Sequence, residues 1–63
     1  MMTDADYQRM CLDQAQIWAA YGYPNQVKQW LKKGNITGAL AEVTIKDALA
    51  AQTERLAENE TLG

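Results

Sequence analysis

Apolar side chains recur at intervals of three and four residues near the start of the 63-residue chain. Thr3 and Asp6 precede them in a capping-box pattern, in which a hydroxyl and a carboxylate each satisfy a free amide at the start of a helix. The spacing places the apolar side chains on one helix face, made of Tyr7, Met10, Cys11, Ala15, Trp18 and Tyr21. Gly22 tolerates the left-handed conformation that ends many helices. The pattern therefore predicts a first helix over residues 4–21.

A second helical pattern follows this glycine. Pro24 suits the first turn of a helix, and Asn25 can accept a hydrogen bond from the amides that follow. The inner face of this helix is narrow and consists of Val27, Trp30 and Leu31. We predict that the helix covers residues 25–33 and ends at Gly34, with Trp18 and Trp30 in the core between the first two helices.

The pattern is weakest in the region that follows Gly34. We predict a short helical turn over residues 37–42 and then a bend, because the next three residues are β-branched, Val43, Thr44 and Ile45. Thr44 and Asp47 repeat the capping-box pattern, so a third helix is expected over residues 44–58. Its helically spaced positions are Ile45, Ala48, Leu49, Gln52 and Leu56. They follow a heptad pattern for little more than two repeats, with Gln52 in the seam, which is too short for a coiled coil. The tail, residues 59–63, is expected to fray.

These elements predict an all-α fold, since no strand alternation or internal repeat interrupts them. The expected architecture is a small three-helix bundle, or a helical hairpin with a third helical arm, in one domain over residues 1–63. A chain of this length buries only roughly 60% of its unfolded surface, which makes a lone core marginal. Ten of the apolar residues are alanines, which bury little area. We therefore expect the chain to form a homodimer.

Charge is distributed unevenly along the chain. Six basic residues against eight acidic ones give a formal net charge of −2 and an isoelectric point near 4.8. Residues 21–34 nevertheless contain three lysines and no acid. An acidic protein repels nucleic acid and acidic membranes on average. The positive segment is therefore the most distinctive feature of the sequence.

The composition excludes most kinds of catalytic site. The chain has no His and no Ser, so it cannot form a serine-hydrolase triad, a Cys–His pair or a histidine zinc site. Its one cysteine, Cys11, lies on the apolar face of the first helix, where a thiol is usually inert. Two acidic pairs, Asp4 with Asp6 and Glu54 with Glu58, are too small for an oxygen-rich metal site. We expect no enzymatic activity, no cofactor and no metal.

The same features suggest a location. A single cysteine allows no intrachain disulfide, and the N-terminus lacks the basic and apolar regions of a signal peptide. No apolar run approaches the roughly 20 residues that span a bilayer. We therefore expect a cytoplasmic protein without a membrane partner.

The favoured functional interpretation is protein binding near the first turn. Tyrosine and tryptophan are common interface anchors, and lysines steer association with an acidic partner. At least one of the two tyrosines beside Gly22 should project from the turn. The predicted partner-binding residues are Tyr21, Tyr23, Asn25, Gln26, Lys28, Gln29, Lys32 and Lys33. The size and composition are those of a regulator, an inhibitor or an assembly factor, such as a phage encodes.

DNA binding is the alternative, with residues 24–33 as a reading helix. Residues 14–33 share the order helix, tight turn, helix with a helix-turn-helix, and their outward amides and lysines can contact bases and phosphates. However, the spacing from Gly22 to Val27 is one residue shorter than that motif requires. One residue rotates the second helix by roughly 100°. Three lysines also neutralise few phosphates, which makes this the less favoured interpretation.

Overall fold

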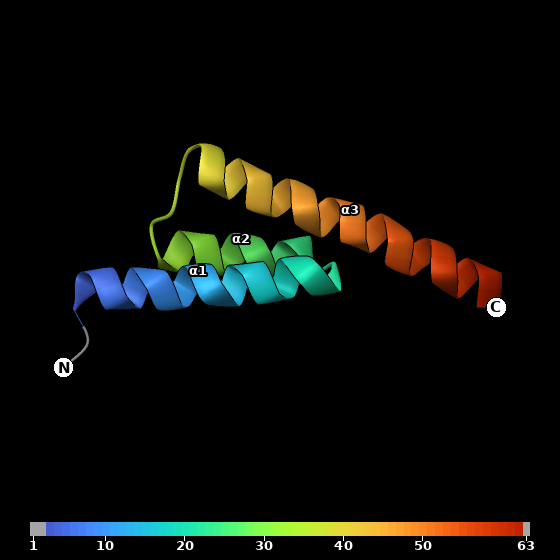
Figure 1. Cartoon of the computed structure of the whole chain (residues 1–63), viewed down its shortest axis with the longest axis horizontal. Coiled ribbons are helices and arrows are strands. Elements are labelled where there is room, and N and C mark those ends of the chain that lie inside the picture. The colour runs from blue at the N-terminus through green and yellow to red at the C-terminus, as the bar shows by residue number, and fades with distance from the viewer. Residues whose placement is uncertain (1–2, 63) are drawn as a thin grey trace.

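The computed structural model describes the backbone of residues 3–62 and the side chains of residues 3–58. Within these bounds the chain forms three helices and no strand: α1 (Asp4–Tyr21), α2 (Pro24–Lys33) and α3 (Ala39–Leu62). In Figure 1, α2 runs back along α1 as an antiparallel hairpin, and α3 packs on the hairpin and extends beyond its end. The predicted all-helical fold is confirmed.

The ends of α1 are those that the local sequence predicts. The amide of Asp6 donates to Thr3 Oγ1 at 3.1 Å, and the amide of Thr3 donates to Asp6 Oδ2 at 3.5 Å. Both halves of the capping box are therefore formed. Gly22 ends the helix in the left-handed conformation, with φ of 82°.

Helix α2 begins at Pro24, one residue before the predicted start. Its N-cap is Tyr23, and no side chain caps it, so the predicted capping role of Asn25 is wrong. Proline has no amide hydrogen and its φ already suits a helix, which makes the first turn possible without a polar cap. The helix ends at Lys33, and the amide of Gly34 donates to the Trp30 carbonyl at 3.0 Å.

Helix α3 is continuous from Ala39, so the prediction of a turn over 37–42, a bend and a new helix from residue 44 is wrong. Thr44 is not a cap: its hydroxyl donates to the Leu40 carbonyl at 2.7 Å within the helix, and the residue is buried. Ile45 and Ala48 pack in or against the core. This packing outweighs the low helix propensity of the β-branched residues.

The predicted frayed tail, residues 59–63, lies outside the residues whose side chains the structure describes. The backbone of α3 is helical to Leu62.

The core is thin because half of its members are alanines. Its buried apolar residues are Cys11, Ala15, Ala19, Val27, Leu31 and Ala48. Trp18 and Trp30 are half-buried and pack against this core, as predicted. Tyr7 and Tyr21, at the ends of the predicted apolar face of α1, are instead exposed. Alanines let the helices approach closely, but they contribute little buried area.

The molecule is elongated, with extents of 47 × 23 × 12 Å. Within the described part of the chain, no helix is both long and apolar enough to cross a membrane.

Candidate binding surface

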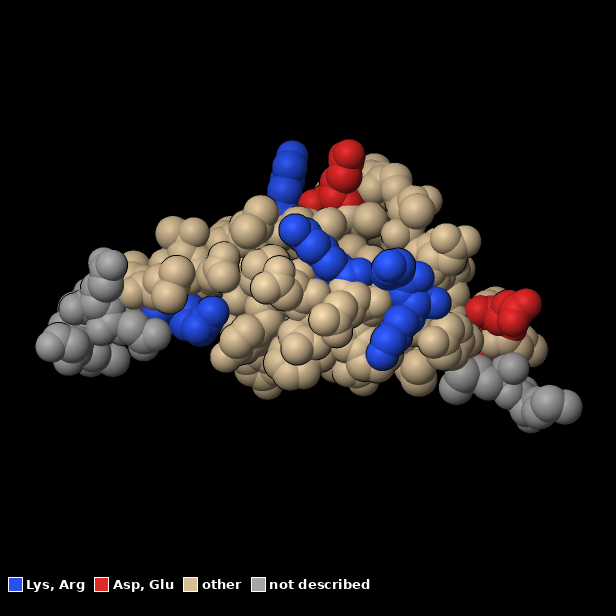
Figure 2. All heavy atoms as spheres, turned by 180° about the vertical axis from the view of Figure 1, so that it is seen from behind, with Lys and Arg blue, Asp and Glu red and all other residues tan. Residues whose placement is uncertain are grey.

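The outward side of α2 is the most strongly charged surface that the sequence predicted. Pro24, Val27 and Leu31 are buried, and they fix which side of the helix faces solvent. The opposite side, which we call the lysine face, consists of the exposed residues Asn25, Gln26, Lys28, Gln29, Lys32 and Lys33. No residue of α2 is acidic. Seen from behind in Figure 2, basic side chains gather over the middle of the molecule, whereas acidic ones lie at its edges.

The three lysines of α2 differ in their surroundings. Lys32 and Lys33 lie in the last turn of α2, where cations interact favourably with the helix dipole. The Nζ atom of Lys33 lies 4.6 Å from the centroid of the Trp30 ring, in a cation–π contact that restrains it. Lys28 and Lys32 are four residues apart and therefore share one side of the helix. The face thus combines one restrained lysine with an adjacent pair.

The two tyrosines beside Gly22 have different surroundings. Tyr21 is 63% exposed, and it is the ring that projects from the end of α1. Tyr23 is 41% exposed, but its ring lies edge-on to Trp18 with centroids 5.6 Å apart. The guanidinium of Arg55 covers the Tyr23 ring at 4.5 Å. Tyr23 therefore links the helices, and Tyr21 is the more exposed of the two tyrosines.

Arg55 fixes the turn from α1 to α2 against α3. Its Nη2 donates to the Gly22 carbonyl at 3.3 Å, while its Nε is buried without a hydrogen-bond partner. A Cβ on Gly22 would lie only 2.7 Å from the amide nitrogen of Gln52 and 2.8 Å from the carbonyl carbon of Ala51. The backbone of the turn therefore rests directly on the backbone of α3.

Sequence analysis did not identify Arg55. The hydrogen bond to Gly22 joins residues 33 positions apart, so no local pattern reveals it. The one available signal is that Arg55 is the last basic residue of the chain, in a segment that is otherwise acidic.

The other end of the hairpin carries two shallow hollows. Gln8, whose Nε2 donates to the Gly34 carbonyl at 3.0 Å, lines both hollows. One hollow, of about 470 Å³, is lined by Ala5, Gln8, Arg9, Leu12, Asn35, Ile36, Thr37 and Leu40. The other, also about 470 Å³, is lined by Asp4, Ala5, Tyr7, Gln8, Lys33, Gly34 and Asn35. Most of these side chains are exposed, whereas small-molecule sites enclose most of their ligand.

The cysteine is placed as the sequence predicted. Cys11 is fully buried in the helix-packed interior. A side-chain hydrogen bond with this thiol raises the pKa of Tyr7, and the charge interaction with it and burial act in the same direction. Over the described residues, no three Cys, Asp or Glu side chains come together where they could share a metal ion.

The fold defines a small elongated three-helix protein with one lysine-rich helix. No protein-family model, curated protein or solved structure matches the chain. The arguments about function therefore rest on the surface itself.

Proposed function

We propose that this chain is a small non-enzymatic regulator, inhibitor or assembly factor that binds an acidic surface of another protein through the lysine face. The observation that supports it is that α2 presents three exposed lysines and no acid, in a chain whose net charge is −2. A positive surface on an otherwise negative protein speeds association with an acidic partner surface and disfavours association with a basic one.

The remaining residues of the face suit a protein partner. Asn25, Gln26 and Gln29 are exposed amides that both donate and accept hydrogen bonds. Tyr21 projects beside the turn from which α2 starts, and tyrosine combines large rigid area with a polar hydroxyl. We propose Tyr21 as the aromatic anchor and the lysines as the charged surroundings.

DNA binding is disfavoured by the arrangement of the first two helices. In a helix-turn-helix the two helices cross at roughly 90–120°. Here α2 runs back alongside α1 (Figure 1), and Gln8 of α1 bonds to Gly34 at the far end of α2. The proposal therefore assigns the lysines to a protein partner.

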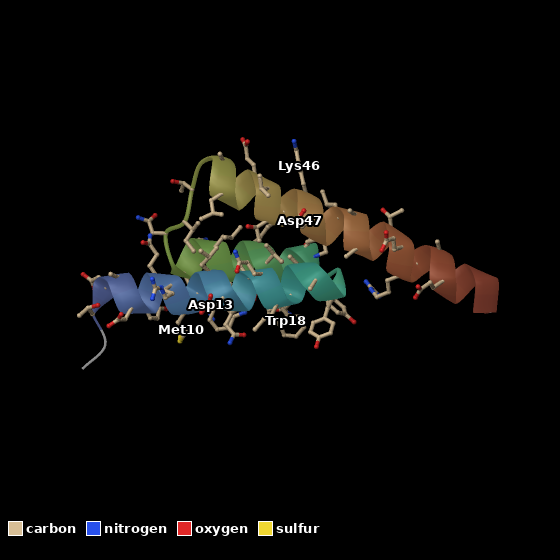
Figure 3. All side chains as sticks on the ribbon, viewed as in Figure 1. Met10, Asp13, Trp18, Lys46 and Asp47 are labelled. Atoms are coloured by element: carbon tan, nitrogen blue, oxygen red, sulfur yellow. The ribbon has the colours of Figure 1, made fainter. Side chains whose placement is uncertain are left out.

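The proposal is tested by affinity capture from lysate of the source organism, with four forms of the chain. The double variant Lys28→Glu, Lys32→Glu and the single variant Tyr21→Ala change the proposed surface. Lys46→Glu is the control for one charge reversal outside the proposed surface, because Lys46 is also exposed but projects from α3 away from the hairpin (Figure 3). We expect one acidic protein to bind the wild-type chain and the Lys46 variant, and to be lost from the double variant.

Salt and DNA titrations complete the test. Capture through the lysine face should weaken as salt is raised, because exposed charges are screened within about 8–10 Å at physiological ionic strength. Equal capture by the double variant would contradict the proposal. Salt-sensitive binding of duplex DNA that is lost in the double variant and kept by the Lys46 variant would replace it with the DNA-binding alternative.

We also propose that the protein acts as a homodimer, which the thin, alanine-rich core supports. A core of this size stabilises a lone chain only marginally. Association would bury apolar area that the monomer leaves in contact with water.

A further inference from the structure

The chain exposes more surface than a compact monomer of its mass. Its accessible surface is 4816 Å², and its mass is 7.0 kDa. A folded monomer of that mass is expected to expose about 4,000 Å². The surplus of about 800 Å² equals what one partner contributes to a standard protein–protein interface. The radius of gyration, 13.2 Å, also exceeds the value of about 11 Å expected for a compact chain of 63 residues.

Helix α3 accounts for this elongated shape. It extends well past the turn at Gly22, where the hairpin ends (Figure 1). Four of its large apolar side chains are exposed by 46–54%, namely Leu40, Val43, Leu49 and Leu56. The exposed surface of α3 is therefore apolar in part, and four further exposed apolar side chains, Tyr7, Ile17, Tyr21 and Tyr23, lie outside this helix.

The four large apolar side chains exposed on α3 belong to two flanks of this helix. Leu49 and Leu56 are seven residues apart, and with Ile45 and Gln52 they form a line at intervals of four, three and four residues, which we call the α3 stripe. Ile45 and Gln52 are half-buried, so the stripe borders the face that packs on the hairpin. At 100° per residue, Leu40 and Val43 fall on the opposite flank.

The α3 stripe has the spacing by which two helices pack side by side, one member every 3.5 residues on average. Three of its members are apolar, and Gln52 is polar. A two-fold axis brings the same surface of both copies together. Leu49 and Leu56 of each copy would then contact the α3 stripe of the other copy. The next position towards the N-terminus, three residues before Ile45, is the charged Glu42. The stripe therefore begins at Ile45.

We infer that the α3 stripe is the surface through which a second copy of this chain binds, with Leu49 and Leu56 as its anchors. This inference rests on the proposed homodimer and names its interface. It uses no residue of the lysine face.

Sedimentation equilibrium over about a hundredfold range of concentration tests this inference, with the population of dimer as the readout. We expect the wild-type chain to dimerise, and the variant Leu49→Ala, Leu56→Ala to raise the dimer Kd at least about a hundredfold, since anchor truncation acts in both copies. The matched control is Leu40→Ala, Val43→Ala, which removes side chains of similar exposure from the other flank. It should change the dimer Kd less than about threefold.

Alanine is the strongest helix former, so both double variants should keep the circular dichroism of the wild-type chain. The Tm of the wild-type chain should rise with protein concentration, and that of the stripe variant should not. A dimer that survives Leu49→Ala, Leu56→Ala, or that the control weakens equally, would overturn the assignment of the interface while leaving the homodimer. A wild-type chain that stays monomeric would overturn the homodimer as well, whereas capture through the lysine face is measured independently.

Discussion

The two connections of this fold contain glycines with the same backbone conformation and opposite surroundings. Gly22, between α1 and α2, has φ of 82°, and Gly38, between α2 and α3, has φ of 81°. A Cβ on Gly22 would meet three backbone atoms of α3 within 3 Å, whereas nothing lies within 4 Å of the corresponding position on Gly38. The first glycine is therefore needed for conformation and for packing, and the second for conformation alone.

The largest expected effect is that of Gly22→Ala. The left-handed conformation costs an L-residue roughly 1–2 kcal/mol, and forcing a methyl group into a packed site costs about 1–3 kcal/mol more. We expect a loss of about 3 kcal/mol in the free energy of unfolding, measured by urea denaturation followed by circular dichroism. A loss no larger than that of Gly38→Ala would show that α3 does not rest on the turn.

Gly34→Ala separates packing from conformation, because Gly34 has an ordinary φ of −85°. A Cβ there would lie 2.7 Å from the Cβ of Cys11, so the cost is steric. We expect a loss of about 2 kcal/mol in the free energy of unfolding.

A double-mutant cycle with Cys11→Gly checks the cause of that loss. Removing the Cβ of Cys11 opens the space that the new methyl group needs. The double variant should be more stable than the sum of the two single losses predicts, by about 1 kcal/mol. Strict additivity would mean that the two positions are not in contact.

Arg55→Met tests how the crowded turn is held to α3. Methionine keeps the length of the side chain but removes the hydrogen bond to Gly22 and the contact with the Tyr23 ring. Methionine also removes the buried Nε, which has no hydrogen-bond partner and therefore destabilises the wild-type chain. This relief offsets part of the stability lost with the two contacts, so we expect a loss of only about 1.5 kcal/mol in the free energy of unfolding. Lys46→Met, at an exposed position of the same helix, is the control and should change stability by less than about 0.5 kcal/mol. Equal effects of the two substitutions would show that the guanidinium does not hold the turn.

The contrast between the two connections also explains which features the sequence predicts. The ends of α1 depend on Thr3, Asp6 and Gly22, which act within one turn of the helix, and they were predicted correctly. The continuity of α3 through Thr44 depends on burial against the hairpin, which local propensity does not contain. Neighbouring residues therefore predict a helix end correctly where a capping residue determines it, and incorrectly where packing against a distant part of the chain determines it.

The candidate binding surface also has features that the sequence predicts and features that it does not. Exposure of Lys28 and Lys32 follows from helical periodicity once Val27 and Leu31 are assigned to the core, and the structure agrees. The different roles of Tyr21 and Tyr23 do not follow from their positions on either side of Gly22. They depend on Arg55, which reaches the turn from the distant end of α3.

Gly38→Ala has the smallest expected effect and decides whether the two connections really differ. Since nothing surrounds the position of a new Cβ, only the backbone conformation opposes the substitution. We expect a loss of about 1 kcal/mol in the free energy of unfolding, measured by the same urea denaturation as for Gly22→Ala. Gly38→Asn should lose less, because asparagine tolerates the left-handed region better than alanine does, as Asn35 shows with φ of 53°. A loss at Gly38 as large as that at Gly22 would mean that the connection to α3 is packed against the rest of the chain, and that conformation alone does not account for its glycine.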